Sequence, residues 1–360
     1  MKIVSIVGAR PQFIKLAPIS HAIARSSHSH VVIHTGQHYD ANMSDVFFDD
    51  LDIAAPKINL SVGSGSHGQQ TAHMLAAIET KLEAIHPDWV LVYGDTNSTA
   101  AGVLAATKMN IPVAHLEAGL RSFNRAMPEE INRILADHLS DLCLAPTLAA
   151  VDHLKNEGLS DRTVHVGDVM TDVLLKTRDE ISGSARAELR RSINVGGKYY
   201  LSTIHRPSNT DDRARLIEIV SALDALPHPV VLAAHPRLQA SAQQFGINLD
   251  RANIRLVPPL PYPQLIMAVQ QSSGVITDSG GLQKEAFILR VPCTTVREET
   301  EWVETLDLGW NVLSPTPEQI GTAVTRPLPA STNEMPYGDG NAAEAVVAAM
   351  EDAKQTKQQD

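Results

Sequence analysis

The feature that most constrains this sequence is an alternation of short apolar runs with longer segments of helical periodicity. In the first half, the apolar runs predict strands at residues 3–7, 31–34, 89–93, 113–116 and 142–145. Helical patterns lie between them, at residues 11–24, 70–85 and 98–109. Short strands that are apolar on both sides are typical of a parallel sheet covered by helices. The order therefore predicts a doubly wound α/β domain.

The same alternation begins again after a polar stretch at residues 179–197. Further strands are expected at residues 199–204, 230–234, 254–257, 274–277 and 294–296, with a helix at residues 211–226. An alanine-rich amphipathic helix is predicted at residues 341–355. A chain of 360 residues fits about two domains. We therefore expect two similar α/β halves that join near residues 170–195.

Composition limits the classes of partner. Lysine and arginine total 30 against 41 aspartate and glutamate residues, which gives a net charge of −11. This balance argues against a nucleic acid or an anionic membrane as partner, because both require clustered positive charge. Two cysteines, Cys143 and Cys293, are too few for a disulfide scaffold. The apolar runs are too short for a signal peptide or a membrane span, so we expect a cytoplasmic protein.

Polar clusters follow the predicted strands of the first half, at the sheet edge where parallel α/β folds bind ligands. Arg10 and Lys15 lie in a strand-to-helix turn that favours an anion, although surface charges are the alternative. Asp95 precedes a run of small hydroxyl residues and either caps the next helix or takes part in chemistry. Glu117 ends an apolar strand, where a buried carboxylate needs a partner.

An ion-pair network is the structural alternative for these carboxylates. Arg121, Arg125 and Arg133 are the candidate partners of Glu117. Glu130 and its neighbour Glu129 also fit the first turn of a helix that begins at Pro128, where acidic side chains offset the helix dipole. Both interpretations remain open from the residues alone.

The second half repeats this arrangement with basic residues and glycines. His205 and Arg206 follow the first strand of this half, and His235 follows the next one, which suggests a clamp for phosphate groups. A later strand runs into Ser279, Gly280 and Gly281 at the start of a helix, a turn whose backbone amides can cradle phosphate oxygens. Glu285, about one helical turn further on, is placed to reach a sugar hydroxyl.

The sequence does not indicate a bound cofactor or a metal. The first strand-to-helix turn is not GxGxxG, so a nicotinamide cofactor loses its main support, and no Lys-Ser/Thr pair completes an ATP-hydrolysing P-loop. Four histidines lie close together, but they lack the spacing of a metal site. They are His28, His30, His34 and His38.

The clusters together resemble the non-hydrolysing UDP-N-acetylglucosamine 2-epimerases over essentially the whole chain. The matching motifs, in the family's order, are GARPQFIK (8–15), HTGQHYD (34–40), GDTNST (94–99), HLEAGLR (115–121), MPEEINR (127–133), TIHRP (203–207), TDSGGLQKEA (277–286) and PYGDG (336–340). The resemblance implies the glycosyltransferase-B architecture, with Rossmann-like domains at residues 1–172 and 173–340 and an active site in the cleft between them. It also implies a last helix, about residues 341–360, that returns to the first domain, and a homodimer.

The resemblance further implies epimerisation at C2 of the sugar without a cofactor. Elimination of UDP across C1–C2 would give a 2-acetamidoglucal, and UDP would add back after protonation on the opposite face. Cations must then stabilise the departing diphosphate, and carboxylates must move protons. By similarity the catalytic residues are Asp95, Glu117 and Glu130, with His205, and the acid and base roles stay open.

The same similarity assigns residues to the nucleotide. Arg10, Lys15 and His205 are expected on the phosphate side, with Arg206 and His235 as further candidates. Ser279 and Gly280, together with Gly281, are expected to bind the diphosphate. Glu285 is expected to bind the uridine ribose. The predicted partner is therefore a UDP-sugar.

Two departures from the family pattern bear on regulation. Tyr39 stands where many bacterial members carry an arginine, and Pro207 with Ser208 stands where they carry the last two residues of the motif HRRE. In those members these positions help to bind a second, activating substrate molecule. Loss of those arginines weakens a second diphosphate site, so we expect this activation to be absent or much reduced.

The motifs also resemble the branch that epimerises UDP-2,3-diacetamido-2,3-dideoxy-glucuronate. Its additional substrate carboxylate requires a cation, for which Arg121 and Arg125 are candidates. UDP-N-acetylglucosamine is the preferred substrate on the breadth of the family. A glycosyltransferase, a hydrolysing epimerase and a non-catalytic nucleotide-sugar sensor are the rival classes.

Overall fold

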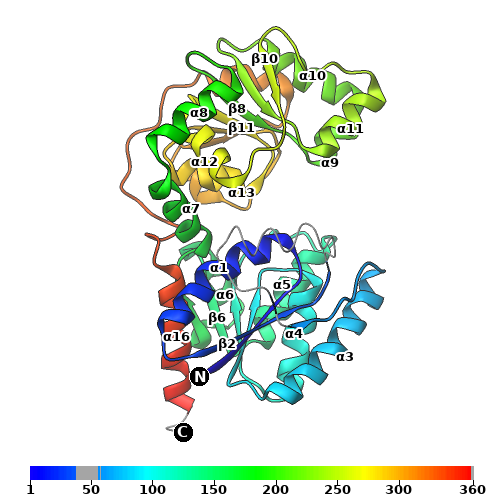
Figure 1. The fold of residues 1–360 in the computed structure, drawn as a ribbon, viewed down its shortest axis with the longest axis vertical. Helices are drawn as coiled ribbons and strands as arrows, with labels where there is room; N and C mark the ends of the chain where they lie inside the picture. The colour runs from blue at the N-terminus through cyan, green and yellow to red at the C-terminus, as the bar shows by residue number, and fades with distance from the viewer. Residues whose placement is uncertain (38–55, 57, 358–360) are drawn as a thin grey trace. The chain divides into compact units, whose positions relative to one another are not determined.

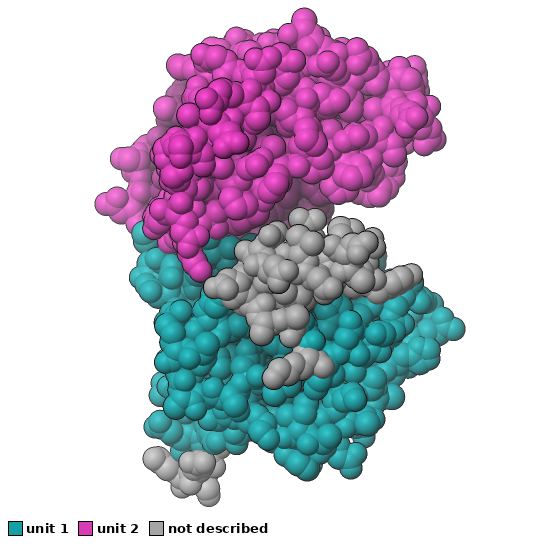
Figure 2. Space-filling view, viewed as in Figure 1, with its two compact units in different colours: residues 1–173, 335–360 teal, residues 174–334 magenta. Residues whose placement is uncertain are grey.

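The computed structural model describes residues 1–37, 56 and 58–357 (Figure 1). It divides the chain into two compact units (Figure 2). Unit 1 consists of residues 1–173 and 335–360, and unit 2 of residues 174–334. The C-terminal segment thus belongs to the same unit as the N-terminus.

Unit 1 is built on a parallel sheet that has seven strands in the described part of the chain, in the order β3-β2-β1-β4-β5-β6-β7. Its strands are β1 (Lys2–Val7), β2 (Ser29–His34), β3 (Ile58–Asn59), β4 (Trp89–Tyr93), β5 (Val113–Leu116), β6 (Leu142–Ala145) and β7 (Thr163–His165). The helical segments are α1 (Arg10–Arg25), α3 (His67–Ile85), α4 (Asn97–Lys108), α5 (Pro128–Leu139), α6 (Leu148–Asn156), η1 (Ser160–Arg162), α7 (Val169–Glu180), which continues into unit 2, and α16 (Ala342–Lys357).

Unit 2 repeats the same topology. Six parallel strands among its residues lie in the order β10-β9-β8-β11-β12-β13. They are β8 (Tyr200–Thr203), β9 (Val230–Ala233), β10 (Ile254–Val257), β11 (Gly274–Thr277), β12 (Cys293–Thr295) and β13 (Asn311–Leu313). The helical segments are α8 (Gly183–Ile193), α9 (Pro207–Thr210), α10 (Arg213–Asp224), α11 (Pro236–Phe245), α12 (Tyr262–Gln271), α13 (Gly280–Ile288), α14 (Val303–Asp307), η2 (Pro317–Gln319) and α15 (Ile320–Val324).

The predicted pair of doubly wound Rossmann-like folds is confirmed. In each unit the first strand lies in the middle of the sheet, between the second and the fourth strand of that unit, so the order of the strands reverses there. In such sheets ligands bind beyond the carboxyl ends of the strands at this reversal. The reversal lies between β1 and β4 in unit 1 and between β8 and β11 in unit 2.

Alternate residues of a central strand pack into apolar cores on opposite faces of the sheet. In β4, Leu91 and Tyr93 pack into a core with α1 and α16, whereas Val90 and Val92 pack into a second core with α3 and α4. A strand buried on both faces needs this continuous apolar character. β3, β7 and β13 were not predicted from the sequence, because they are two or three residues long and leave little apolar pattern to read.

Helix α16 completes the core of unit 1. Val346, Val347 and Met350 pack with residues of α1 and β4, and α16 lies beside α1 in Figure 1. Polar contacts add to this packing, since Lys354 pairs with Asp88 at 2.9 Å. None of the helices in the described ranges is both long and apolar enough to cross a membrane.

Candidate active site

The carboxyl ends of β4 and β5 bring two of the predicted carboxylates close to the start of α1. Asp95 follows β4 through Gly94, and Glu117 follows β5. Gly94 (φ 59°) and Glu117 (φ 74°) both have left-handed backbone conformations, which turn the chain sharply at the strand ends. A left-handed glutamate is uncommon, and residues of this kind concentrate at functional sites.

Glu117 forms an ion pair with Lys15 of α1. Each side chain is only 13% exposed. Burial by itself would lower the pKa of Lys15, but the carboxylate of Glu117, with Asp95 and Asp168 nearby, outweighs it and raises the pKa. Lys15 is therefore held as a cation beside the carboxylate.

A second ion-pair chain joins Asp95 to Glu130 through Arg133. Arg133 lies one turn after Glu130 on α5 and donates to it at 2.9 Å, while its other nitrogen donates to Asp95 at 2.6 Å. Asn132 adds a bond from its side-chain amide to the carbonyl oxygen of Asp95 at 2.9 Å. Consecutive residues of α5 thus fix the position of Asp95.

The carboxylates differ in their access to solvent. The Asp95 side chain is 30% exposed, but that of Glu130 only 1%. Glu130 accepts hydrogen bonds from the amides of Ser122 and Phe123, both at 2.9 Å, and from the Ser122 hydroxyl at 3.0 Å. Burial would raise the pKa of Glu130, but these bonds and that from Arg133 outweigh it and lower the pKa. Glu130 therefore holds the loop before α5 as a buried anion.

A polar network extends from the turn after β4 to the turn between β1 and α1. The Gln12 side chain accepts from the amides of Gly8 (2.8 Å) and Ala9 (3.0 Å), and donates to the carbonyl oxygen of Tyr93 at 2.7 Å. A Cβ at Gly8 would lie 2.0 Å from the Thr35 hydroxyl oxygen, so only glycine fits there. Of the predicted anion-binding residues here, Arg10 has a side chain outside the described set, although its backbone begins α1.

In unit 2, Asp278 after β11 organises the loop after β8. Its carboxylate accepts from the backbone amides of His205 (3.0 and 3.1 Å) and Arg206 (2.9 Å), and from the Asn209 side chain at 3.0 Å. The His205 ring also contacts it at 3.0 Å. Burial would raise the pKa of Asp278, but His205 and Asn209 outweigh it, so the pKa is lowered. Asp278 thus fixes the predicted phosphate-side residues.

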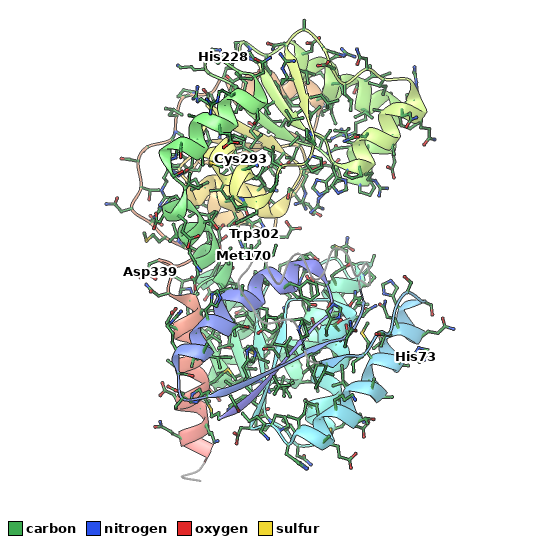
Figure 3. All side chains as sticks on the ribbon, viewed as in Figure 1. His73, Met170, His228, Cys293, Trp302 and Asp339 are labelled. Carbon is green, nitrogen blue, oxygen red and sulfur yellow. The ribbon has the colours of Figure 1, made fainter. Side chains whose placement is uncertain are left out.

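The predicted phosphate turn begins α13 in the same unit. Ser279 is the residue before the helix, and Gly280 and Gly281 form its first turn. A Cβ at Gly280 would lie 3.3 Å from the Trp302 indole nitrogen, whereas Gly281 faces open space. Trp302, labelled in Figure 3, is buried and carries Lys284 over its ring at 4.2 Å. A side chain at the first of these positions would therefore be in tight contact with Trp302.

The remaining predicted residues of unit 2 lie around these two turns. The rings of His205 and His235 are 5.3 Å apart between centroids, and His235 caps α11 by accepting from the Arg237 amide. Arg206 donates to the carbonyl oxygen of Asp278 at 3.0 Å, so its guanidinium also lies at the ends of β8 and β11. Glu285 is buried in α13.

The histidines considered for a metal have separate roles. His28 contacts Glu351 at 2.6 Å, His30 contacts the Ser5 hydroxyl at 2.8 Å, and His34 accepts from the Gly36 amide at 2.7 Å. His38 lies outside the described residues. Within the ranges that the structure describes, no group of three histidine, cysteine or acidic residues could hold a metal ion.

Comparison with known proteins decides the family. The family model of UDP-N-acetylglucosamine 2-epimerase matches residues 21–351. The chain belongs to the UDP-N-acetylglucosamine 2-epimerase family. A UDP-N-acetylglucosamine 2-epimerase homolog of Methanococcus maripaludis is 46% identical over 96% of this chain and 98% of its own. The UDP-2,3-diacetamido-2,3-dideoxy-D-glucuronate 2-epimerase of Pseudomonas aeruginosa is 48% identical over 87% of this chain and 88% of its own.

A solved structure agrees over nearly the full length. The Methanocaldococcus jannaschii UDP-GlcNAc 2-epimerase, in complex with UDP-GlcNAc and UDP, is 39% identical. The two align with a TM-score of 0.85 over 98% of this chain and 99% of that one. The predicted family is therefore confirmed, together with its two-domain α/β fold.

In this member of the family, the two arginines that are candidates for binding a substrate carboxylate differ in their contacts. Arg121 is buried and paired with Asp137 at 2.7 Å and with Glu157 at 2.7 Å. Arg125 is exposed and has no hydrogen bond or ion pair to any residue that the structure describes. Arg125 is therefore the more available cation of the two.

The sequence missed several residues that organise this site. Gln12 and Asp278 lie inside the quoted motifs, but neither was singled out, although each is a polar residue directly beside a strand-end turn. Asp137 was also missed. A signal was available for it, since it lies four residues after Arg133 on α5. That spacing places both side chains on one face of the helix, toward the strand ends.

Proposed function

We propose that this protein catalyses C2 epimerisation of a UDP-N-acetyl-hexosamine, interconverting UDP-N-acetylglucosamine and UDP-N-acetylmannosamine. The observation that carries the proposal is the pair of partly exposed carboxylates at neighbouring strand ends. Asp95 and Glu117 each have an adjoining cation, Arg133 and Lys15. Membership of the epimerase family supports the same conclusion.

The proposed reaction is an elimination followed by a re-addition. A carboxylate takes the proton from C2, the C2–H electron pair forms the C1–C2 double bond, and the C1–O bond breaks with its electrons going to UDP. The intermediate is a 2-acetamidoglucal. Protonation of C2 on the opposite face and return of UDP to C1 give the epimer, so no redox cofactor is consumed.

The structure favours Asp95 and Glu117 as the proton-transferring groups. Both side chains are partly exposed, whereas Glu130 is enclosed by four hydrogen-bond donors. A general base must reach the proton that it abstracts. We therefore assign Glu130 to holding Arg133 and the preceding loop, and leave acid and base unassigned between the other two.

The nucleotide is proposed to bind mainly to unit 2. The amides at the start of α13, at Gly280 and Gly281, favour diphosphate oxygens because a helix N-terminus attracts anions. His205, Arg206 and His235 supply donors or positive charge around the same strand ends, and Ser279 a hydroxyl. Glu285 is proposed to bind the ribose. Lys15 and Arg10 of unit 1 are also proposed to bind on the phosphate side of the nucleotide.

A second substrate has specific support. The P. aeruginosa relative, named for UDP-2,3-diacetamido-2,3-dideoxy-D-glucuronate, is 48% identical to this chain over 320 aligned residues. The exposed guanidinium of Arg125 would suit the additional carboxylate of that sugar. It lies on the loop between β5 and α5 that Glu130 holds through the amides of Ser122 and Phe123.

One experiment distinguishes these functions and their rivals. The protein is incubated with each nucleotide sugar in deuterated water. Deuterium at C2 in a sugar that still carries UDP supports epimerisation and identifies the substrate. Release of UDP supports a transferase or a hydrolysing enzyme, and an unchanged sugar supports a sensor. Either of the last two results would overturn the proposal.

The remaining features of the family are proposed on similarity alone. We infer that the protein is cytoplasmic and forms a homodimer. Sedimentation of the purified protein would test its oligomeric state. The substrate curve is expected to be hyperbolic, because Tyr39 and Pro207 stand where many bacterial members carry arginines of the activating site. Tyr39 itself lies outside the described residues. A strongly sigmoidal curve would contradict this expectation.

A further inference from the structure

A fully buried ion pair lies beneath the two carboxylate turns. His115 on β5 and Asp137 on α5 are both 0% exposed. The Nδ1 atom of His115 lies 2.6 Å from one Asp137 oxygen, and its Nε2 atom lies 2.7 Å from the carbonyl oxygen of Gly94. A carbonyl oxygen can only accept, so Nε2 carries a proton.

The second ring nitrogen carries a proton as well. Asp137 accepts from the Gly119 amide at 3.1 Å and pairs with Arg121 at 2.7 Å, so it is held as a carboxylate. A carboxylate can only accept from Nδ1. His115 is therefore an imidazolium, and its charge is balanced locally, since Arg121 is in turn paired with Glu157.

This pair touches both turns that carry the proposed catalytic groups. Through Gly94 it holds the residue directly before Asp95, and through Gly119 it holds the turn that begins at Glu117. The two turns are also in close contact, because a Cβ at Gly94 would lie 3.3 Å from a carboxylate oxygen of Glu117 and 3.4 Å from the Lys15 nitrogen. A shift of either turn would change the Lys15–Glu117 pair.

We propose that His115 and Asp137 are positioning residues for the reaction, which fix the Asp95 and Glu117 turns in one arrangement through a buried imidazolium–carboxylate pair. The effect on turnover rests on the proposed function. Neither side chain reaches solvent, so neither is assigned a contact with substrate. Their role is to preserve the separation of two groups that must act on the same carbon atom.

The test compares two variants with a matched control. Asp137→Asn removes the charge at nearly constant shape. His115→Gln removes the ion pair but leaves the bonds of Asp137 to Arg121 and Gly119 in place. If Asp137→Asn fails to fold, His115→Gln still tests the positioning role. Glu157→Gln breaks the outer ion pair of the same network without touching either turn.

Both test variants should lower kcat by about 30- to 100-fold, the effect of displacing a reacting group by about 1 Å. Affinity for UDP should stay within about threefold, and Glu157→Gln should retain wild-type kcat within about twofold. A merely structural role would lower the melting temperature of all three variants without this separation of kcat from UDP affinity. A normal kcat for His115→Gln, or an equal loss in Glu157→Gln, would overturn the inference.

Crystal structures of the variants supply a readout that does not depend on activity. Displacement of the Gly94 carbonyl and of Glu117 in His115→Gln, but not in Glu157→Gln, is the expected result. Unchanged positions would overturn the positioning role. A wild-type protein that epimerises neither nucleotide sugar would instead refute the proposed function, and the structural comparison would still decide the role of the pair.

Discussion

At the scale of single residues, burial separates carboxylates that look equivalent in the sequence. Asp95 and Glu117 keep part of their surface exposed beside one cation each, whereas Glu130 is enclosed by donors that favour its charged form. A carboxylate stabilised in this way is a weak base, because each bond is lost when it takes up a proton. Position in the chain does not reveal this difference.

Replacing Glu117 with glutamine tests its role in proton transfer. The substitution keeps the shape but removes the basic oxygen, so turnover should fall by a factor of about 100 or more while UDP binding survives. Steady-state kinetics and calorimetric titration with UDP measure the two effects. Glu129→Gln, at an exposed position near the site, is the control and should remain active. Near-normal turnover of Glu117→Gln would remove this residue from the catalytic set.

Gly94 offers a second test at this scale. Gly94→Ala places a Cβ 3.3 Å from Glu117 in a left-handed conformation, so it should disturb the Lys15–Glu117 pair and lower kcat by about tenfold or more. Gly158→Ala has the same backbone strain (φ 78°) but faces open space. Both variants should lose about 1 kcal/mol of stability. Equal activities in the two variants would show that the contact with Glu117 is unimportant.

At the scale of elements, single helices supply several of the side chains that hold neighbouring turns and helix ends in place. α5 supplies Glu130, Asn132 and Arg133 to one side of the β4 turn and Asp137 to the network beneath it. α16 begins where the carboxylate of Asp172 on α7 accepts from the amides of Ala342 (3.1 Å) and Ala343 (2.8 Å). An acidic side chain at a helix N-terminus replaces the bonding partners that the first turn lacks.

The Asp172 contact predicts a dependence of stability on pH. Burial raises the pKa of Asp172 to about 6, with Glu344 and Asp168 adding to the shift, although the two amide bonds oppose it. The folded state therefore binds the proton more tightly than the unfolded state, whose pKa is near 3.8. The contribution of this group to stability is favourable below about pH 4 and is lost as the pH rises through about 6.

Urea unfolding of the wild type and of Asp172→Asn at pH 4.5 and pH 7.5 isolates this effect from other titrating groups. The measured quantity is the free energy of unfolding of the variant minus that of the wild type. This difference should increase by about 1–2 kcal/mol from pH 4.5 to pH 7.5, after allowance for solvent screening. A difference between the two proteins that is constant across this range would contradict the raised pKa.

At the scale of the whole molecule, the two units differ in how they are assembled from the chain. Unit 2 is one continuous segment with its own sheet and two apolar cores. Unit 1 needs a segment from each end of the chain, because α16 contributes Val346, Val347 and Met350 to its core. Removing those side chains would leave apolar surface of α1 and β4 exposed to water.

Fragments of the chain test this assembly. Residues 174–334 should fold alone and unfold in one cooperative thermal transition. Residues 1–173 should fail to give a stable fold unless residues 335–360 are added as a peptide, since the missing helix leaves a large part of one core uncovered. Circular dichroism and calorimetry measure both. A stable transition of residues 1–173 alone would show that α16 is dispensable.

The sequence alone determined the positions of several strands, the strand-end position of two carboxylates and the family resemblance. The strands at residues 89–93, 113–116 and 142–145 were predicted with their observed bounds, because burial on both faces leaves a clear local apolar signal. The strand-end position of Asp95 and Glu117 followed from the same pattern, and the family resemblance came from motifs that can be read directly.

Only the tertiary structure decided which groups meet. Lys15 and Glu117 are 102 residues apart in the chain, and Asp137 and His115 lie on different elements that the order of the strands brings together. The availability of Arg125 rather than Arg121, and the enclosure of Glu130, also depend on contacts between distant segments. Local periodicity fixes elements, but ion pairs and burial arise from their packing, which no local pattern encodes.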